Sequence, residues 1–153
     1  NGKVRTISGT GEATIQEIVL LNQQGQVSDV IEVGEPVTLQ VKVKVKRDIP
    51  RLVLGFMIKD RMGQSIYGIN THRLNQAREN LTAGTELVYR YDFVANIGKG
   101  HYSVALSLSR LDSHLDTNYE WRDFALVFHV INSTKPDFVG AASLDASLSI
   151  EQL

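Results

Sequence analysis

The chain has 153 residues, of which 42% are hydrophobic and 22% are charged, a composition typical of one soluble globular domain. The formal net charge of -1 gives no general attraction to nucleic acid, and no apolar run approaches the roughly 20 residues that a membrane helix needs. The absence of cysteine excludes disulfides and thiolate metal sites. We therefore expect no nucleic-acid partner and no direct membrane insertion. Because the chain begins at Asn1 rather than methionine, we expect a domain of a longer protein.

A period-two alternation of apolar and polar residues predicts a series of half-buried strands. The alternation is clearest from Val37 to Lys46, where valine and leucine alternate with threonine, glutamine and lysine. In chain order, the predicted strands cover residues 12–21, 37–46, 52–59, 64–71, 86–94, 101–110 and 122–132. An irregular alternation near Glu17 and Ile18 predicts a β-bulge in the first strand. Residues 1–10 are expected to form a flexible linker, and the spacing of Leu74, Ala77 and Leu81 indicates at most one short turn or helix.

Many short strands separated by turn residues predict one all-β domain over residues 1–153, an immunoglobulin-like antiparallel β-sandwich. A local feature favours this sandwich. Tyr102 follows Gly98-Lys99-Gly100-His101 and precedes the core position Val104 by two residues, which is the sequence form of a tyrosine corner. The alternative is that Tyr102 only packs in the core.

Residues 138–150, after Pro136, have the small and apolar composition of one more strand, although the sandwich is already complete. Pro136 before this segment allows the segment to leave its own sheet. The strand at 122–132 is apolar on both faces, which implies a second covering layer. One expectation is a homodimer in which this strand is exchanged into the sheet of a second copy. The alternative is a tail that pairs with its own sheet or is disordered.

Antiparallel pairing places three polar segments at one rim of the sandwich: residues 46–51, the end of the strand at 64–71, and the connection at 111–121. That connection is long for a hairpin and ends in the only tryptophan of the chain. An aromatic ring can cover the apolar face of a sugar, while planar amide, carboxylate and guanidinium groups can bind its hydroxyls. The predicted carbohydrate-binding residues are Asn70, Arg73, Arg110, Asp112, His114, Tyr119 and Trp121.

Other interpretations of these residues stay open. Trp121 could cap the core, and Arg110 could form a surface ion pair with Asp112 or Glu120. A second possible location for the site is the outer face of the sheet formed by the strands at 52–59, 101–110 and 122–132. Its small-residue floor would consist of Ser103, Ala105, Ser107 and Ser109, beside Met57 and His129.

No motif predicts catalysis, a metal or a cofactor. Asp112-Ser113-His114 contains the residue types of a hydrolase triad, but adjacent residues rarely supply its convergent geometry, and no G-x-S-x-G motif is present. His72, His114 and Asp116 have no diagnostic ligand spacing. Gly98 and Gly100 lead into a predicted strand rather than a helix, so they do not form a phosphate-binding loop. We therefore expect a binding module rather than an enzyme.

Several ordered segments resemble the Wzt C-terminal domain family. They are Gly34-Glu35-Pro36-Val37-Thr38-Leu39, the stretch from Gly55 to Gly63, Tyr67-Gly68-Ile69-Asn70-Thr71, Gly100-His101-Tyr102-Ser103-Val104, Tyr119-Glu120-Trp121-Arg122-Asp123 and Phe128-His129-Val130. The resemblance covers residues 10–132, and its most specific part is G-F-x-I-x-D-x-x-G followed by Y-G-x-N-T.

The resemblance implies a domain that binds a finished O-antigen polysaccharide, usually near its non-reducing terminus, and couples it to export by an ABC transporter. It also implies a parent protein with an ATPase domain, a cytoplasmic location at the inner membrane, a transmembrane transporter subunit as partner, and function in pairs. The family has no invariant catalytic set, so the binding residues above rest on loop geometry alone. The alternative is a protein-interaction β-sandwich that docks a transporter or glycosyltransferase partner.

Overall fold

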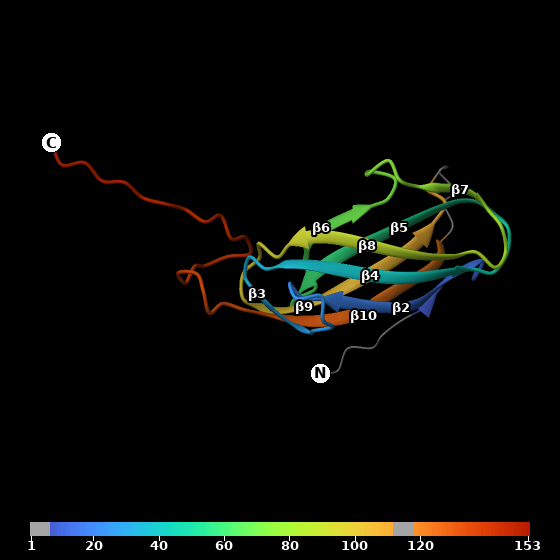
Figure 1. Cartoon of the computed structure of the whole chain (residues 1–153), viewed down its shortest axis with the longest axis horizontal. Helices are drawn as coiled ribbons and strands as arrows, with labels where there is room; N and C mark the ends of the chain where they lie inside the picture. Colours follow the sequence, from blue (N-terminus) through green and yellow to red (C-terminus); the bar gives the residue numbers. More distant parts are fainter. Residues whose placement is uncertain (1–6, 112–117) are drawn as a thin grey trace.

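The computed structural model describes residues 7–111 and 118–153, and over these residues it contains strands and no helix. Accordingly, no helix in this part of the chain is long and apolar enough to cross a membrane. Two layers of strands form the body of the molecule, and the C-terminal tail leads away from it (Figure 1). The strands are β1 (Ile7–Ser8), β2 (Ala13–Leu21), β3 (Val30–Glu32), β4 (Pro36–Val45), β5 (Ile49–Asp60), β6 (Ser65–Asn70), β7 (Arg78–Leu81), β8 (Glu86–Val94), β9 (Gly100–Ser109) and β10 (Asn118–Ile131).

The two layers have different sizes. The larger sheet has the order β1-β10-β9-β5-β6, with β3 also pairing with β10 and β7 also pairing with β5. The smaller sheet has the order β2-β4-β8. Every pairing is antiparallel except that between β3 and β10. The predicted all-β antiparallel sandwich is therefore confirmed.

The core lies between the two sheets, as the period-two pattern requires. In β4, all five residues of the apolar set from Val37 to Val45 are at most 4% exposed. The facing strands β5 and β9 contribute Leu54, Phe56, Leu106 and Leu108, which are also buried. Phe56 packs edge-on against Tyr91 of β8, with 4.7 Å between the ring centroids. Removal of these side chains from water is the main stabilising contribution to the fold.

Most predicted strands lie close to the observed ones, and β8 matches its predicted range of 86–94. The bulge in β2 is confirmed, although it lies between Ile15 and Glu17. Of the short turn or helix predicted around Leu74, the structure has turns, which lead into β7, and β7 pairs with the first half of β5. Within the described part of the predicted linker, residues 7–10, β1 pairs with β10 and the Thr10 amide donates to the Asn118 carbonyl at 3.2 Å.

The tyrosine corner is confirmed. The hydroxyl of Tyr102, a residue only 7% exposed, donates to the Gly98 carbonyl at 2.6 Å. Burial raises the pKa of this hydroxyl, so it remains a donor at neutral pH. The bond fixes the loop before β9 and positions Gly98 beside Gly140, where a side chain on Gly98 would collide with the Gly140 carbonyl.

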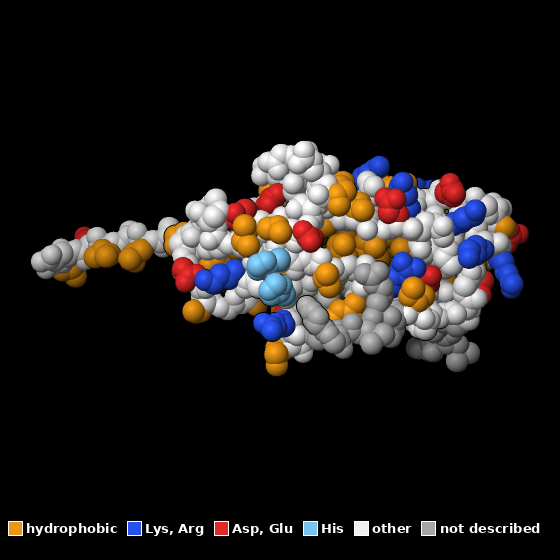
Figure 2. All heavy atoms as spheres, turned by 90° about the horizontal axis from the view of Figure 1, so that it is seen from below, with side chains coloured by type: hydrophobic (Ala, Val, Ile, Leu, Met, Phe, Trp, Pro, Cys, Tyr) orange, Lys and Arg blue, Asp and Glu red, His pale blue; other side chains and the backbone are white. Residues whose placement is uncertain are grey.

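The tail after β10 has no strand of its own in this single chain. Its first part stays near the body through an isolated antiparallel bridge between Ile97 and Ala142. Beyond Asp145 it extends into solvent, and hydrophobic side chains lie along the projecting segment (Figure 2). Leu144, Leu148 and Ile150 of this segment are each more than 80% exposed.

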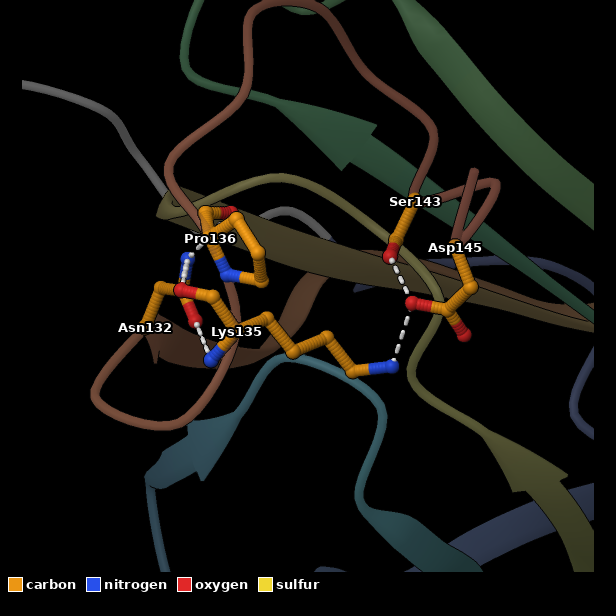
Figure 3. A network of polar contacts seen from close by, with 5 residues as sticks. All are labelled: Asn132, Lys135, Pro136, Ser143 and Asp145. Carbon is orange, nitrogen blue, oxygen red and sulfur yellow. Dashed lines mark hydrogen bonds and ion pairs between the residues drawn. The ribbon is translucent and has the colours of Figure 1, made fainter. Parts of the chain in front are cut away.

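A polar network holds the root of this tail (Figure 3). The Asn132 side chain accepts a bond from the Lys135 amide at 3.1 Å, and the Lys135 ammonium contacts Asp145 at 2.6 Å. Ser143 also donates to Asp145 at 3.4 Å. Glu32 on β3 accepts bonds from the hydroxyl and the amide of Ser133. The carboxylates of Glu32 and Asp145 therefore hold the first part of the tail in place.

Acid should loosen this network. The hydroxyl and then the amide of Ser133 lower the pKa of Glu32, and the Lys135 ammonium lowers that of Asp145. A carboxylate with a lowered folded-state pKa contributes fully above its unfolded pKa, and the contribution is lost as pH falls through the folded value. We expect the Ser133 amide resonance to titrate with a midpoint below the ordinary pKa of glutamate, and Glu32→Gln to abolish this step. A midpoint at or above the ordinary value would contradict the assignment.

Candidate functional site

Described parts of the three polar segments predicted at one rim lie close together. The Arg51 guanidinium, at the start of β5, donates to the carbonyls of Arg110 and Leu111 at 2.8 and 2.9 Å. It also lies 2.9 Å from Nδ1 of His72, just after β6. Arg51 thereby joins the segment before β5, the end of β6 and the segment after β9. This connection fixes the position of the rim relative to the larger sheet.

A groove of about 360 Å³ lies on the outer face of the larger sheet, next to this rim. Its floor is made of small or flexible residues of β5 and β9, and its borders come from β6, the following turn and β10. The lining residues that matter most are Asn70, Arg73, Gly55, Met57, Ala105, Ser107 and Trp121. The groove therefore combines three residues predicted at the rim with part of the floor predicted on the sheet face, Ala105 and Ser107 beside Met57; Ser103, Ser109 and His129 do not line it.

Strand register explains why these residues meet. Asn70 of β6 is opposite Gly55 of β5, Gly55 is opposite Ser107 of β9, and Ser107 is opposite Trp121 of β10. These four residues form one row across four strands, and directly opposite residues point to the same face of a sheet. Any β-carbon on Gly55 would lie 3.0 Å from the Ser107 hydroxyl oxygen. The row is consequently open in its middle and has polar and aromatic groups at its ends.

The polar end of β6 has a structural reason. Thr71 is buried: its hydroxyl accepts a bond from the Leu54 amide at 3.1 Å, while its own amide donates to the Leu54 carbonyl at 3.0 Å. Asn70 caps the next turn by accepting a bond from the Arg73 amide at 2.8 Å. This turn leaves the exposed Arg73 side chain beside the groove, and no described residue forms an ion pair or hydrogen bond with its guanidinium.

An ion pair links the two strands on either side of β9. Lys59 of β5 and Asp123 of β10 lie 3.7 Å apart, with β9 between their strands. Asp123 belongs to a bulge where the β9–β10 register shifts, and Phe124 has a positive φ of 47° there. Strained bulges often redirect side chains near binding sites. Here the bulge brings the Asp123 carboxylate toward Lys59, next to Trp121.

Beyond this ion pair, two histidines lie side by side on the same sheet. His101 and His129 are opposite each other on β9 and β10, and their rings stack with centroids 4.2 Å apart. Histidine side chains are visible together on this side of the molecule in Figure 2. Within the described residues, no group of three or more His, Cys, Asp or Glu is arranged to hold a metal ion.

The other predicted site residues have different positions. Tyr119 is buried, 4% exposed, and its hydroxyl donates to the Arg51 carbonyl at 2.9 Å, so it supports the rim from within and does not face a ligand. Arg110 is exposed and its carbonyl binds Arg51, but it does not line the groove. Asp112 and His114 lie outside the described residues.

A buried ion pair in β10, the strand that contains Trp121, was not predicted. Glu120 and Arg122 of β10 lie 3.1 Å apart, and Glu120 is 6% exposed. The Glu120 carboxylate accepts a bond from the Ile15 amide at 3.1 Å, and the Arg122 guanidinium donates to the Ile15 carbonyl at 3.2 Å. The two side chains thus satisfy both backbone groups of Ile15, where the bulge interrupts the β2–β4 ladder.

The side chains that line the groove suit a ligand with hydroxyl groups and flat apolar faces. The half-buried Trp121 offers an aromatic surface, Asn70 and Ser107 offer hydrogen-bonding groups, and Arg73 offers fixed donors and positive charge. Each of these groups binds without forming or breaking a covalent bond. Binding is therefore the chemistry that this arrangement supports.

Comparison with known proteins identifies one family and several similar solved structures. The family described as Wzt C-terminal domain matches residues 4–144. A solved structure described as the C-terminal domain of wzt is similar with a TM-score of 0.82 and 21% identity, over 96% of this chain and 89% of that chain. A β-glucosidase from Listeria innocua in complex with glucose is similar over 82% of this chain and 16% of its own, with 12% identity and a TM-score of 0.40. No curated protein sequence matches the chain significantly.

Proposed function

Because the chain belongs to the Wzt C-terminal domain family, a non-catalytic domain associated with O-antigen ABC transporters, we propose that it binds an O-polysaccharide in the groove between Asn70 and Trp121. The observation that carries the proposal is the row of four opposite residues that leaves an open floor between an amide and an indole. A sugar ring lying on the indole would place its hydroxyl groups within reach of Asn70, Ser107 and Arg73.

The end of a glycan fits this groove better than the middle of a long chain. Trp121 borders one end of the groove, and the Asn70–Arg73 turn borders the other. The volume of about 360 Å³ is at the small end of the roughly 300–1,000 Å³ typical of small-ligand pockets. The non-reducing terminus is the end that remains free while the other end is attached to its carrier.

Titration with the glycan of the source strain tests the proposal. We expect saturable binding that is weak at each site, because sugar hydroxyls exchange water for protein hydrogen bonds at small net gain. Folded protein that binds neither the polysaccharide nor its terminal oligosaccharide at millimolar ligand would overturn the proposal. That result would favour a domain that docks a transporter or glycosyltransferase subunit instead.

Under this proposal, the domain is part of a larger transport complex. The parent protein would carry an ATPase domain and act in the cytoplasm, held at the inner membrane by the transmembrane subunit of the transporter. Glycan binding would then couple the finished polysaccharide to export. The coding region around this chain tests this point, since a phosphate-binding loop in the same polypeptide is expected and a hydrolase domain there would contradict it.

We also infer that the chain forms a homodimer through its C-terminal segment. The exposed apolar residues after Pro136, which include Val139, Leu144 and Leu148, have no cover in the single chain. Sedimentation of the full chain should give twice the monomer mass, and deletion of residues 137–153 should give a monomer or an aggregating species. A full chain that sediments as a monomer at high micromolar concentration would contradict the dimer.

A further inference from the structure

A cross-strand pair of histidines lies on the outer face of the larger sheet, away from the groove beside Trp121. His101 of β9 is directly opposite His129 of β10; His101 is exposed and His129 is half-buried. Along β9, His101 is six residues from Ser107 in the groove floor, which corresponds to about 20 Å of extended strand. The function proposed for the groove therefore gives these two histidines no role.

The backbone geometry brings the two side chains close together. The His129 amide donates to the Asp29 carbonyl at 2.7 Å, so it is directed toward the start of β3 and not toward β9. His101 and His129 are therefore a non-hydrogen-bonded antiparallel pair, the type in which Cα atoms lie about 4.5 Å apart and side chains are closest. The two rings stack accordingly, with their centroids 4.2 Å apart and their planes inclined by 11°.

Both backbones are held in place without a ligand. The hydrogen bond from its amide to Asp29 fixes His129 on β10. On β9, the Tyr102 hydroxyl donates to the Gly98 carbonyl at 2.6 Å and so fixes the loop that precedes His101. A site that is ordered in advance loses less conformational entropy when it binds.

The ring nitrogens of this pair are available to a ligand. Within the described structure, no hydrogen bond or ion pair engages either imidazole. The neighbours of His129 on the same face are the exposed apolar residues Val127 and Ile131 of β10 and Val30 of β3. These side chains have no polar group that competes for the ring nitrogens. A neutral imidazole carries one lone-pair nitrogen, a ligand that suits Zn²⁺, Ni²⁺ and Cu²⁺.

The ring separation suits one metal ion. With metal–nitrogen bonds of about 2.0–2.1 Å, two nitrogens on one tetrahedral ion are about 3.3 Å apart. A small rotation of either side chain brings the ring edges to this separation from a stack with centroids 4.2 Å apart. We propose that His101 and His129 chelate one divalent transition-metal ion, such as Zn²⁺, across β9 and β10. Two protein ligands leave the other coordination positions to water or to an oxygen ligand.

Calorimetric titration of tag-free, chelator-treated protein with metal salts tests the site. We expect saturable binding of one Zn²⁺ or Ni²⁺ per chain, tighter binding of Cu²⁺, and no binding of Mg²⁺. His101→Ala and His129→Ala should each weaken Zn²⁺ binding by about 100-fold, because loss of a ligand costs at least as much as loss of a group that orients one, itself about 10–100-fold. His72→Ala is the matched control, since it removes a histidine that contacts Arg51 at the rim, and it should retain the original affinity.

The double variant His101→Ala with His129→Ala distinguishes a chelate from two independent histidines. Either single replacement already breaks a chelate, so the double variant should bind Zn²⁺ little more weakly than the single variants. Independent rings would instead leave each single variant with half the sites at unchanged affinity.

Nuclear magnetic resonance of the unmodified chain gives a readout that does not depend on the folding of a variant. Added Zn²⁺ should shift the ring resonances of His101 and His129 along one saturation curve and leave those of His72 in place. The absence of saturable Zn²⁺ binding, the half-site stoichiometry, or an equal affinity loss in His72→Ala would each overturn the proposal.

Discussion

Replacement of Glu120 by alanine should lower the free energy of unfolding by about 3–5 kcal/mol, the loss typical when one partner of a buried ion pair is removed. Two losses combine. The Arg122 guanidinium keeps its charge without its carboxylate partner at 3.1 Å, and its Nε already has no hydrogen-bond partner within the described structure. The Ile15 amide also loses its acceptor at the bulge of β2. Chemical denaturation followed by fluorescence of the single tryptophan measures the effect.

A neighbouring exposed carboxylate provides the control. Glu17 is paired with Lys42 at 3.8 Å, and both side chains are 47% exposed. Glu17→Ala should therefore change the free energy of unfolding by no more than about 0.5 kcal/mol. The double variant Glu120→Leu with Arg122→Met should be less destabilised than Glu120→Ala, because it leaves no buried charge. If Glu120→Ala unfolds like Glu17→Ala, the ion pair has no structural role.

Trp121→Ala should weaken glycan binding about thirtyfold, or by about 2 kcal/mol, the size expected for a central aromatic contact. The substitution removes the only aromatic ring of the row from Asn70 to Trp121. Phenylalanine at the same position should recover part of the affinity, since it restores a flat apolar surface. Calorimetric titration with the terminal oligosaccharide gives the comparison, and thermal unfolding shows whether each variant is folded.

Val127→Ala is the matched control for this substitution. Val127 is an exposed apolar residue on the same strand and outer face, beside Ser103 and past the Lys59–Asp123 ion pair. Its removal should leave affinity unchanged. Equal affinity losses at positions 121 and 127 would indicate that the whole face, rather than the groove, binds the glycan. A folded Trp121→Ala variant with the original affinity would exclude the indole from the site.

The fold was predictable from the sequence wherever a strand has one buried face and one exposed face. Period-two alternation located β2, β4, β8 and β9 well because burial on one face imposes that pattern. The short strands β1, β3 and β7 were missed because two to four residues are too few to show a period. The spacing of the leucines near β7 did not distinguish a turn from a helix, for a related reason: Leu81 contacts the core, while Leu74 is 43% exposed and belongs to a turn.

The site was only partly predictable, and the reason is local geometry in β10. The strand begins at Asn118, and its register with β9 shifts between Asn118 and Glu120. This irregularity buries both Tyr119 and Glu120, so neither the position nor the orientation of Tyr119 followed from alternation. Asn70, Arg73 and Trp121 do line one groove, but only the register across four strands shows that the small residues of the sheet face form its floor.

Binding of a glycan terminus between Asn70 and Trp121 is tested most directly by nuclear magnetic resonance. The chain contains one tryptophan, so a single indole N–H resonance reports on the groove without assignment ambiguity. Titration with the terminal oligosaccharide should shift this resonance and the backbone amides of Ser107 and Asn70 along one saturation curve, while the amides of β8 stay unchanged. Saturable shifts confined to residues outside the groove, with an unmoved indole resonance, would contradict the proposed site.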